Sequence, residues 1–357
     1  MILSRHAGEL IAVALMLIAS SANAAKQVES NCDRWCLKAI ADNYVAAMFK
    51  HDTKVVKVSP NVVVSENTRS IKFGEGVFAT AKKFFSGENQ TQYVMDTQQG
   101  EVGYMGILDA PGAAFYALRL KVMDGAITEI ETLVTRREDG SPFWPEGYLY
   151  REAPYIRDVP KPVRSSRAGL RKAADTYWRV GGTTHQGSSV PYTQDCVHFQ
   201  NGMNTDWERP LNSWEKDAYV QPSDGRIWTC AREVDLTTMK WTQTRGVHHL
   251  FDEERGLVMT WAFADTDPAK ASKAPTNPDG SALPRPAWYY GPPGGPGPNG
   301  LSGPAAGAPT FNRRIEPFTM YHAVVMRVVK GRIQREQVFQ RELDLPAQRP
   351  FTSDWQK

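Results

Sequence analysis

Residues 37–44 read LKAIADNY and residues 170–177 read LRKAADTY, so one short pattern occurs twice in this chain of 357 residues. Leucine, alanine, aspartate and tyrosine recur at the same spacing in both copies, and both copies have the periodicity of an amphipathic helix. We therefore expect one helix at the start of each of two similar units.

A second pair of segments repeats downstream, in the same order. Residues 117–125 (ALRLKVMDG) resemble residues 323–331 (AVVMRVVKG), and each alternating run ends in a turn with glycine, which predicts a β-hairpin. Further strand patterns lie at 61–68 and 194–202, and a third hairpin is expected at 241–251 and 257–264. A helix followed by such strands predicts an α+β fold, with helices packed on a curved antiparallel sheet in each unit.

The two matches divide the chain into tandem domains. We place the first domain at 30–140, a linker rich in proline and aromatic residues at 141–166, and the second domain at 167–345. The second domain contains a Pro/Gly-rich insertion at 267–311, which is either a surface insertion or a lid with an aromatic tip at 288–290. Two similar domains in one chain predict a monomer that contains an internal pseudo-dimer.

The first 24 residues have the three parts of a secretory signal. Arg5 and His6 precede an apolar run at 10–19, and Ala22-Asn23-Ala24 gives the small-x-small pattern of a cleavage site. The apolar run is shorter than the ~20 residues that span a bilayer, and no later run is longer. The sequence therefore predicts a secreted or periplasmic protein without a membrane span.

Charge and cysteine content narrow the class further. There are 42 Lys and Arg against 39 Asp and Glu, a net charge of +3 without a basic stripe, which argues against a nucleic-acid partner. The spacing of the four cysteines is poor for a zinc site, and their even number in an oxidising compartment predicts two disulfides. Three pairings are possible, and we favour the local ones, Cys32–Cys36 and Cys196–Cys230.

Several motifs resemble a known family. They include Ser65-Glu66-Asn67-Thr68, Gly74-Glu75-Gly76 and Cys196-x-His198-x-Gln200-Asn201-Gly202. The chain resembles secreted tandem proteins, frequent in fungi and present in bacteria, that form a domain family of unknown function in the SnoaL-like (nuclear-transport-factor-two-like) superfamily. The family commonly has Arg and Glu where this chain has His198 and Gln200, and Arg-Arg-Tyr where it has residues 248–250 (HHL).

This resemblance implies a fold and a range of functions. Each domain is expected to be a cone of curved sheet closed by helices around a pocket. Relatives in the superfamily include dehydratases, ketosteroid isomerase, polyketide cyclases and epoxide hydrolases, beside many members that are not catalytic. The fold alone therefore does not give the activity.

The second domain holds five histidines, against one in the first domain. Strand alternation places His322 inward among apolar neighbours, and only one of His248 and His249 can face the cone. Imidazoles that meet in one cavity can serve as general acid or base, or three of them can bind a metal. No short-spaced histidine motif is present, so we expect neither a metal nor another cofactor. A core histidine with satisfied hydrogen bonds is the structural alternative for each.

These patterns give two functional hypotheses. The first is a lyase or isomerase that acts by His/Tyr acid–base chemistry on a small, partly apolar or aromatic substrate; its catalytic candidates are His198, His322, Tyr177, His248 and Asp195. The substrate-binding candidates are Trp261, Tyr192, His249, Glu66 and Asn67. The second hypothesis is a non-catalytic small-molecule binding protein, and a histidine-ligated metal enzyme is a further alternative.

Overall fold

The computed structural model describes residues 32–85, 92–139, 143, 145, 155–181, 187–204, 230–231, 241–267, 269, 317–345 and 347–351. The predicted signal segment, most of the 267–311 insertion and much of the 141–166 linker lie outside these residues. Short 3-10 turns occur at η1 (Thr53–Val55), η3 (Arg137–Asp139), η6 (Lys161–Val163) and η8 (Gly187–Ser189). No described helix is both long and apolar enough to cross a membrane.

The first sheet follows helix α1 (Arg34–Lys50). Asp33 caps α1 by accepting the N–H of Cys36, and the helix ends where His51 adopts a left-handed conformation. The sheet has the order β2-β1-β7-β6-β5-β3, and β4 also pairs with β5. Its elements are β1 (Val58–Glu66), β2 (Arg69–Ser70), the short helix α2 (Val77–Thr80), β3 (Lys83–Phe84), β4 (Gln92–Asp96), β5 (Glu101–Asp109), β6 (Ala113–Met123) and β7 (Ala126–Thr135).

The second sheet follows helix α3 (Arg167–Thr176), which continues into a π-helical turn, η7 (Tyr177–Gly181). Its strand order is β10-β11-β12-β13-β8-β9. The strands are β8 (Tyr192–Gln200), β9 (Met203–Asn204), β10 (Trp241–Asp252), β11 (Leu257–Thr266), β12 (Phe318–Val329) and β13 (Arg332–Asp344). Read from β2 and from β9, the first five strands of the two sheets correspond in order, and β4, which also pairs with β5, corresponds to β10.

An asparagine at the same place in each half fixes this correspondence. Asn67 bonds the backbone N–H and C=O of Val134 through its side-chain amide, and Asn201 bonds the N–H and C=O of Gln340 in the same way. Both asparagines have positive φ in the turn after the first strand of their sheet. Val134 and Gln340 are therefore equivalent positions, and the neighbouring strand pairings extend the equivalence.

The mixed α+β fold is confirmed, and the hairpins expected near 117–125, 241–264 and 323–331 are β6–β7, β10–β11 and β12–β13. The expectation that each sheet is wholly antiparallel is wrong at one pairing in each. β1 pairs parallel to β7, and β8 pairs parallel to β13. These strands are far apart in the chain, so no tight turn sets their direction and a long crossover permits the parallel pairing.

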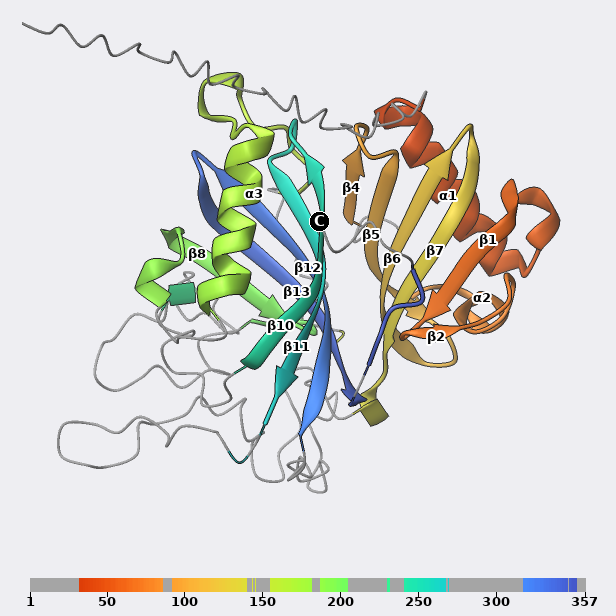
Figure 1. The fold of residues 1–357 in the computed structure, drawn as a ribbon. Helices are drawn as coiled ribbons and strands as arrows, with labels where there is room; N and C mark the ends of the chain where they lie inside the picture. The colour runs from red at the N-terminus through yellow and green to blue at the C-terminus, as the bar shows by residue number, and fades with distance from the viewer. Residues whose placement is uncertain are drawn as a thin grey trace, which may run out of the picture.

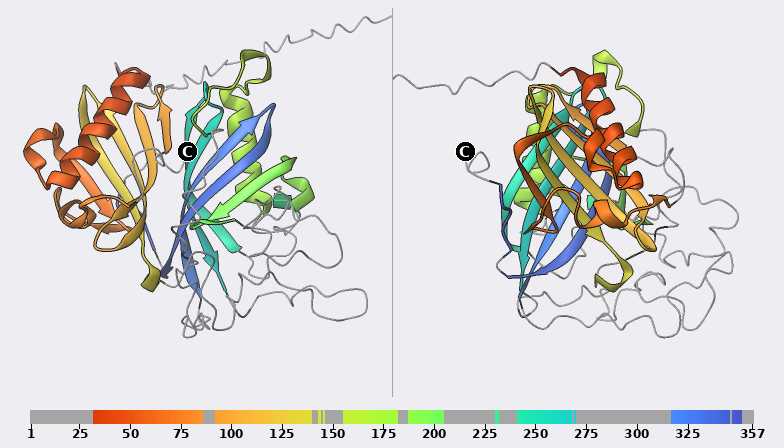
Figure 2. Two further views of the ribbon diagram at one scale, coloured as in Figure 1. Left: turned by 180° about the vertical axis from the view of Figure 1, so that it is seen from behind. Right: turned by 90° about the vertical axis from the view of Figure 1, so that its right-hand side faces the viewer.

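The two sheets pack face to face, with α1 and α3 on opposite outer sides (Figures 1 and 2). One side of each sheet faces its helix, and we call it the helix-facing side. The other side meets the other sheet in an inter-sheet layer, whose buried members include Met105, Phe115, Trp261, Tyr321 and Phe339. Alternate residues along each strand therefore belong to two different cores.

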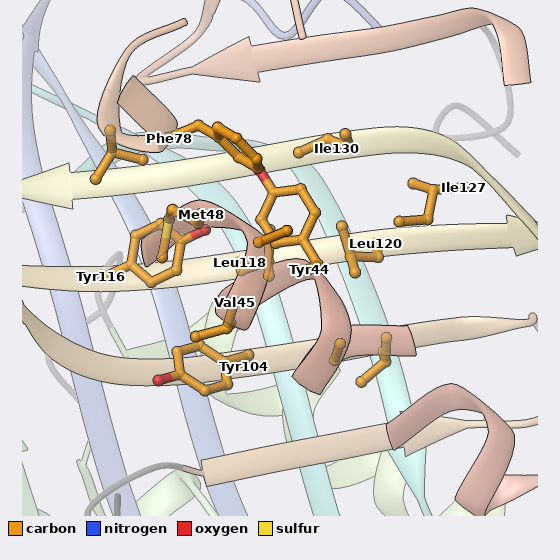
Figure 3. Close-up of a cluster of buried hydrophobic side chains, with 14 of the residues drawn as sticks. Tyr44, Val45, Met48, Phe78, Tyr104, Tyr116, Leu118, Leu120, Ile127 and Ile130 are labelled. Carbon is orange, nitrogen blue, oxygen red and sulfur yellow. The ribbon is translucent and has the colours of Figure 1, made fainter. Parts of the chain in front are cut away.

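The helix-facing side of the first sheet is filled by apolar and aromatic side chains. Figure 3 shows Tyr44, Val45 and Met48 of α1 lying against Tyr104 and Tyr116 of the sheet. Tyr44 also meets Phe78 edge-on, with ring centroids 5.5 Å apart. This close packing gives the first half a core built by α1 and its sheet.

Both predicted disulfides are confirmed. Cys32 pairs with Cys36 at the start of α1, and Cys196 on β8 pairs with Cys230. No free cysteine is found in the described part of the chain.

Candidate functional site

His322 lies on the helix-facing side of β12, as strand alternation predicts. Val324 and Met326 share this side and belong to the core beneath α3, whereas Tyr321 and Ala323 belong to the inter-sheet layer. The His322 side chain is buried, with 3 % of the residue exposed. β12 thus presents an imidazole to the interior of the second half.

Two tryptophans contact this imidazole, and a tyrosine packs against both of them. The ring centroids of Trp178 and Trp241 each lie 5.4 Å from the centroid of the His322 ring. The two tryptophan rings stack on each other, with centroids 5.3 Å apart. Tyr177 meets Trp178 edge-on at 5.1 Å. Tyr177 and Trp178 are carried by the π-helical turn η7, a distortion that is frequent at functional sites.

The ring nitrogens of His322 are unusual for a buried histidine. Within the described residues, neither Nδ1 nor Nε2 of His322 has a hydrogen-bond partner, and the same holds for Nε1 of Trp178. Burial lowers the pKa of His322 to about 3, with a smaller contribution from His198. The imidazole is therefore neutral near pH 7, with one nitrogen able to donate a hydrogen bond and the other able to accept one.

Further polar side chains lie on the same side of the neighbouring strands. Gln340 of β13 lies opposite His322, and Glu336 of β13 lies opposite His198 of β8. Gln340 is 5 % exposed and Glu336 is 1 % exposed. The helix-facing side of the second sheet therefore carries a band of polar groups across β12, β13 and β8.

Most of the corresponding positions of the first half carry apolar side chains. Because Val134 is equivalent to Gln340, the strand pairings make Tyr116 equivalent to His322, Ile130 to Glu336 and Val64 to His198. All four residues belong to the core under α1; Val64, Ile130 and Val134 are apolar, and Tyr116 carries a buried hydroxyl. The two helices start at Arg34 and Arg167, so Trp178 likewise corresponds to Val45.

This difference identifies the second half as the candidate site. Burying a polar group costs free energy unless it is hydrogen-bonded, and the first half is built with apolar side chains at three of these four positions. Local departures from good packing are expected where a protein has a function. We therefore take the His322 cluster to comprise His322, Trp178, Trp241, Tyr177 and His198.

His249 faces the same interior but has a different environment. Its Nδ1 lies 2.7 Å from Thr260 Oγ1, and its Nε2 lies 3.0 Å from Asp175 Oδ1 on α3. The equivalent pair in the first half is Tyr93 and Asp42, 2.7 Å apart. Because both ring nitrogens are engaged and the contact recurs in the other half, His249 holds α3 to its sheet.

His248 points the other way, into the inter-sheet layer. Its Nε2 lies 2.6 Å from Oε2 of Glu101, on the first sheet. Burial holds the pKa of His248 well below its usual value and raises that of Glu101 to about 7. The expectation that His248 is a catalytic residue inside the cone is therefore corrected. Adjacent residues of a strand face opposite sides, and it is His249 that lies on the helix-facing side of the second sheet.

Three other candidates also lie away from the His322 cluster or at its margin. Trp261 belongs to the inter-sheet layer, so it does not line the helix-facing side. Asp195 is exposed, and its backbone carbonyl accepts a hydrogen bond from Arg335. Tyr192 is buried in the core under α3.

Glu66 and Asn67 of the first half form structural bonds. Glu66 accepts the N–H of Val77 at the start of α2, and Asn67 joins its turn to β7 as described above. Their partners are backbone groups. The structure therefore does not bring them to the second-half site.

Trp178, Trp241, Glu336 and Gln340 were not among the sequence candidates. Comparing the repeats position by position could have found Trp178, because valine stands at the equivalent Val45. The other three follow only from strand register, which the sequence does not fix. In the described residues, no group of three or more His, Cys, Asp or Glu side chains is arranged to hold a metal ion.

The comparisons with known proteins add little beyond this geometry. Residues 163–339 match a family described as Domain of unknown function (DUF8021), and a search of curated proteins finds no match.

Three solved structures are similar over part of the chain. A de novo designed protein with a curved β-sheet is 13% identical, covers 29% of this chain and 88% of its own, and has a TM-score of 0.23. AclR from Streptomyces galilaeus is 15% identical, with 28% and 77% covered and a TM-score of 0.21. PrhC from Penicillium brasilianum is 8% identical, with 49% and 82% covered and a TM-score of 0.24.

Proposed function

We propose that the protein binds a small, partly apolar molecule on the helix-facing side of its second sheet. The observation that carries this proposal is His322, a buried imidazole whose two nitrogens have no partner among the described residues. A ligand hydroxyl would bond one of these nitrogens, a ligand carbonyl would accept from the protonated one, and the rings of Trp178 and Trp241 would contact the apolar part of the ligand. Apolar walls with a few polar groups are typical of small-molecule sites.

The architecture fits this proposal. We infer that the two halves are tandem SnoaL-like cones, in which the first cone is a scaffold and the second carries the site. The apolar residues at three of the four equivalent positions of the first half support that division. The two disulfides fit an exported protein that works in an oxidising compartment.

A lyase or isomerase is the second candidate, and Tyr177 beside the same rings favours it. His322 would not be the general base there, because a base works best with a pKa near the working pH and burial brings this pKa to about 3. Its neutral N–H would instead stabilise a developing oxyanion, and His198 would move the proton.

Calorimetric titration with 2-naphthol, a flat apolar molecule with one hydroxyl, tests the binding proposal. The His322→Phe variant keeps a ring but removes both nitrogens, and Tyr116→Phe removes a polar atom at the equivalent place in the first half. We expect the Kd of 2-naphthol to rise at least tenfold in His322→Phe and to stay unchanged in Tyr116→Phe. Equal affinity in all three proteins, or no binding to the unmodified chain, would contradict the proposal.

Native mass spectrometry of the secreted chain separates the two functions. An organic adduct that is lost in His322→Phe would support the second-half site and provide a compound to assay for turnover. Conversion of that compound by the unmodified chain would favour the lyase or isomerase, and unchanged recovery would favour binding alone.

A further inference from the structure

A short segment that follows β13 in the sequence packs against the body of the fold. Residues 347–351 (AQRPF) lie along the inter-sheet layer. Ala347 and Phe351 are buried at 6 % and 8 %, the Arg349 side chain is 5 % exposed, and Gln348 between them is exposed. Burial of alternate side chains is typical of an extended peptide bound at a surface.

Arg349 enters a site that fits a guanidinium group. Its Nε and Nη2 donate to the two oxygens of Glu131, and its Nη1 donates to the carbonyl of Gly246 at 3.2 Å. The ring of Trp261 lies 5.9 Å from the guanidinium carbon. Two parallel bonds to one carboxylate are the contact that arginine makes and lysine cannot.

The groups that contact Arg349 belong to β7, β10 and β11, and residues of β6 and β12 orient its carboxylate partner. Glu131 is on β7 and is fully buried, and it is oriented by Nε of Arg119 at 2.8 Å and by the hydroxyl of Tyr321. Gly246 has a φ of +59° at a register shift in β10, which places its carbonyl toward the guanidinium. The site is therefore built by residues outside the segment that fills it.

Two further contacts define what the site accepts on either side of the arginine. The Phe351 ring lies 4.9 Å from the guanidinium carbon of Arg119, and the carbonyl of Ala347 accepts Nη1 of Arg245 at 2.6 Å. Cation–π contact favours an aromatic residue two positions after the arginine. The pattern recognised is thus an extended segment with a small residue, an arginine and an aromatic residue at alternate positions.

We propose that the inter-sheet layer holds a peptide-recognition site that is occupied by the chain's own residues 347–351. The kind of partner that it fits is an extended peptide with the pattern small-x-Arg-x-aromatic. The site is separate from the His322 cluster, because its walls are residues of the opposite side of the second sheet together with β7. Release of the C-terminal segment exposes it.

A labelled peptide of residues 345–352 (LPAQRPFT) tests this proposal by fluorescence anisotropy. The full chain with Arg349→Ala and Phe351→Ala should bind the peptide saturably, and the unmodified chain should bind it at least tenfold more weakly because its own segment competes. A peptide with lysine in place of the arginine should also bind the double variant at least tenfold more weakly.

A second variant keeps the test decisive if the double variant does not fold. Arg349→Lys retains a positive charge next to Glu131 but loses the two-point contact, so the peptide should displace its segment and bind saturably. Absence of saturable binding to a folded variant, or equal binding of the arginine and lysine peptides, would overturn the proposal.

Discussion

Arg34 and Asp252 lie 218 positions apart and form a two-point ion pair between the two halves of the molecule. Arg34 is the first residue of α1, and Asp252 is the last residue of β10. The distances are 2.5 Å from Nη1 to Oδ1 and 2.9 Å from Nη2 to Oδ2. Arg167 at the start of α3 contacts Asp96 at the end of β4 in the same way, at 2.9 and 2.7 Å.

The backbone repeats this exchange. Asp252 accepts the N–H of Met95 at 3.4 Å, and Asp96 accepts the N–H of Phe251 at 2.9 Å. Each half thus contributes an arginine that pairs with an aspartate of the other half. Each half also contributes an aspartate that accepts a backbone N–H from a strand of the other half. This is the reciprocity of an isologous dimer, here contained in one chain.

Removing Arg34 should destabilise the protein as a whole. Asp252 is fully buried, so Arg34→Ala leaves a carboxylate without its cation, and we expect the free energy of unfolding to fall by about 2–4 kcal/mol. Denaturant unfolding followed by tryptophan fluorescence gives this value. Lys38→Ala removes the more exposed pair with Asp42 and serves as the control, for which a loss below about 1 kcal/mol is expected. Similar small losses in both variants would show that the reciprocal contact does not hold the halves together.

Replacing His322 should separate stability from binding. His322→Phe removes two buried nitrogens without partners among the described residues, so the free energy of unfolding should stay the same or rise by about 1 kcal/mol. Ligand binding should be lost in the same variant. Thermal unfolding and calorimetric titration on one preparation measure both. A stability loss above about 1 kcal/mol would instead identify His322 as a structural residue.

The pair of Glu101 and His248 should shape the dependence of stability on pH. Burial raises the pKa of Glu101 from 4.5 to about 7, so its contribution is fully present below pH 4.5 and is lost as the pH rises to about 7. The pKa of His248 is lowered from 6.5, so its contribution is present above pH 6.5 and is lost as the pH falls. The two effects oppose each other between pH 4.5 and 6.5.

Glu101→Gln removes one of these opposing effects. Relative to the unmodified chain, its free energy of unfolding should rise by roughly 2–3 kcal/mol between pH 5 and pH 8, at about 1.4 kcal/mol for each unit of pKa shift. Urea unfolding at several pH values tests this. Other charged groups also act on the pKa values of Glu101 and His248, and they are present in both proteins: Arg119, Lys121, Glu129, Asp96, His249 and Arg349. A parallel pH profile in the variant would refute the assignment.

The two disulfides should contribute unequally. Cys196 and Cys230 are separated by 34 positions and Cys32 and Cys36 by 4, and the entropy of the unfolded chain predicts about 4 and about 2 kcal/mol respectively. Paired serine substitutions at each site, compared by denaturant unfolding, measure the difference. Cys196 lies in the core under α3, so its loss should also weaken ligand binding. An equal effect of the two double substitutions would contradict this ranking.

Local pattern was sufficient for much of the fold. The repeated helix at 37–44 and 170–177, the three hairpins and the inward orientation of His322 follow from helical and strand periodicity, which neighbouring residues set. The local disulfide pairings also agree with the structure. These features depend on short-range geometry that the amino-acid sequence determines directly.

The contacts of the candidate site required the tertiary structure. Alternation shows that His248 and His249 face opposite sides of β10, but only sheet packing shows that His248 meets Glu101, 147 positions away. The same holds for Trp178 and Trp241, which lie on separate elements and stack beside His322. A strand pattern gives two sides without saying what covers each, because that depends on long-range packing of both sheets and on strand register.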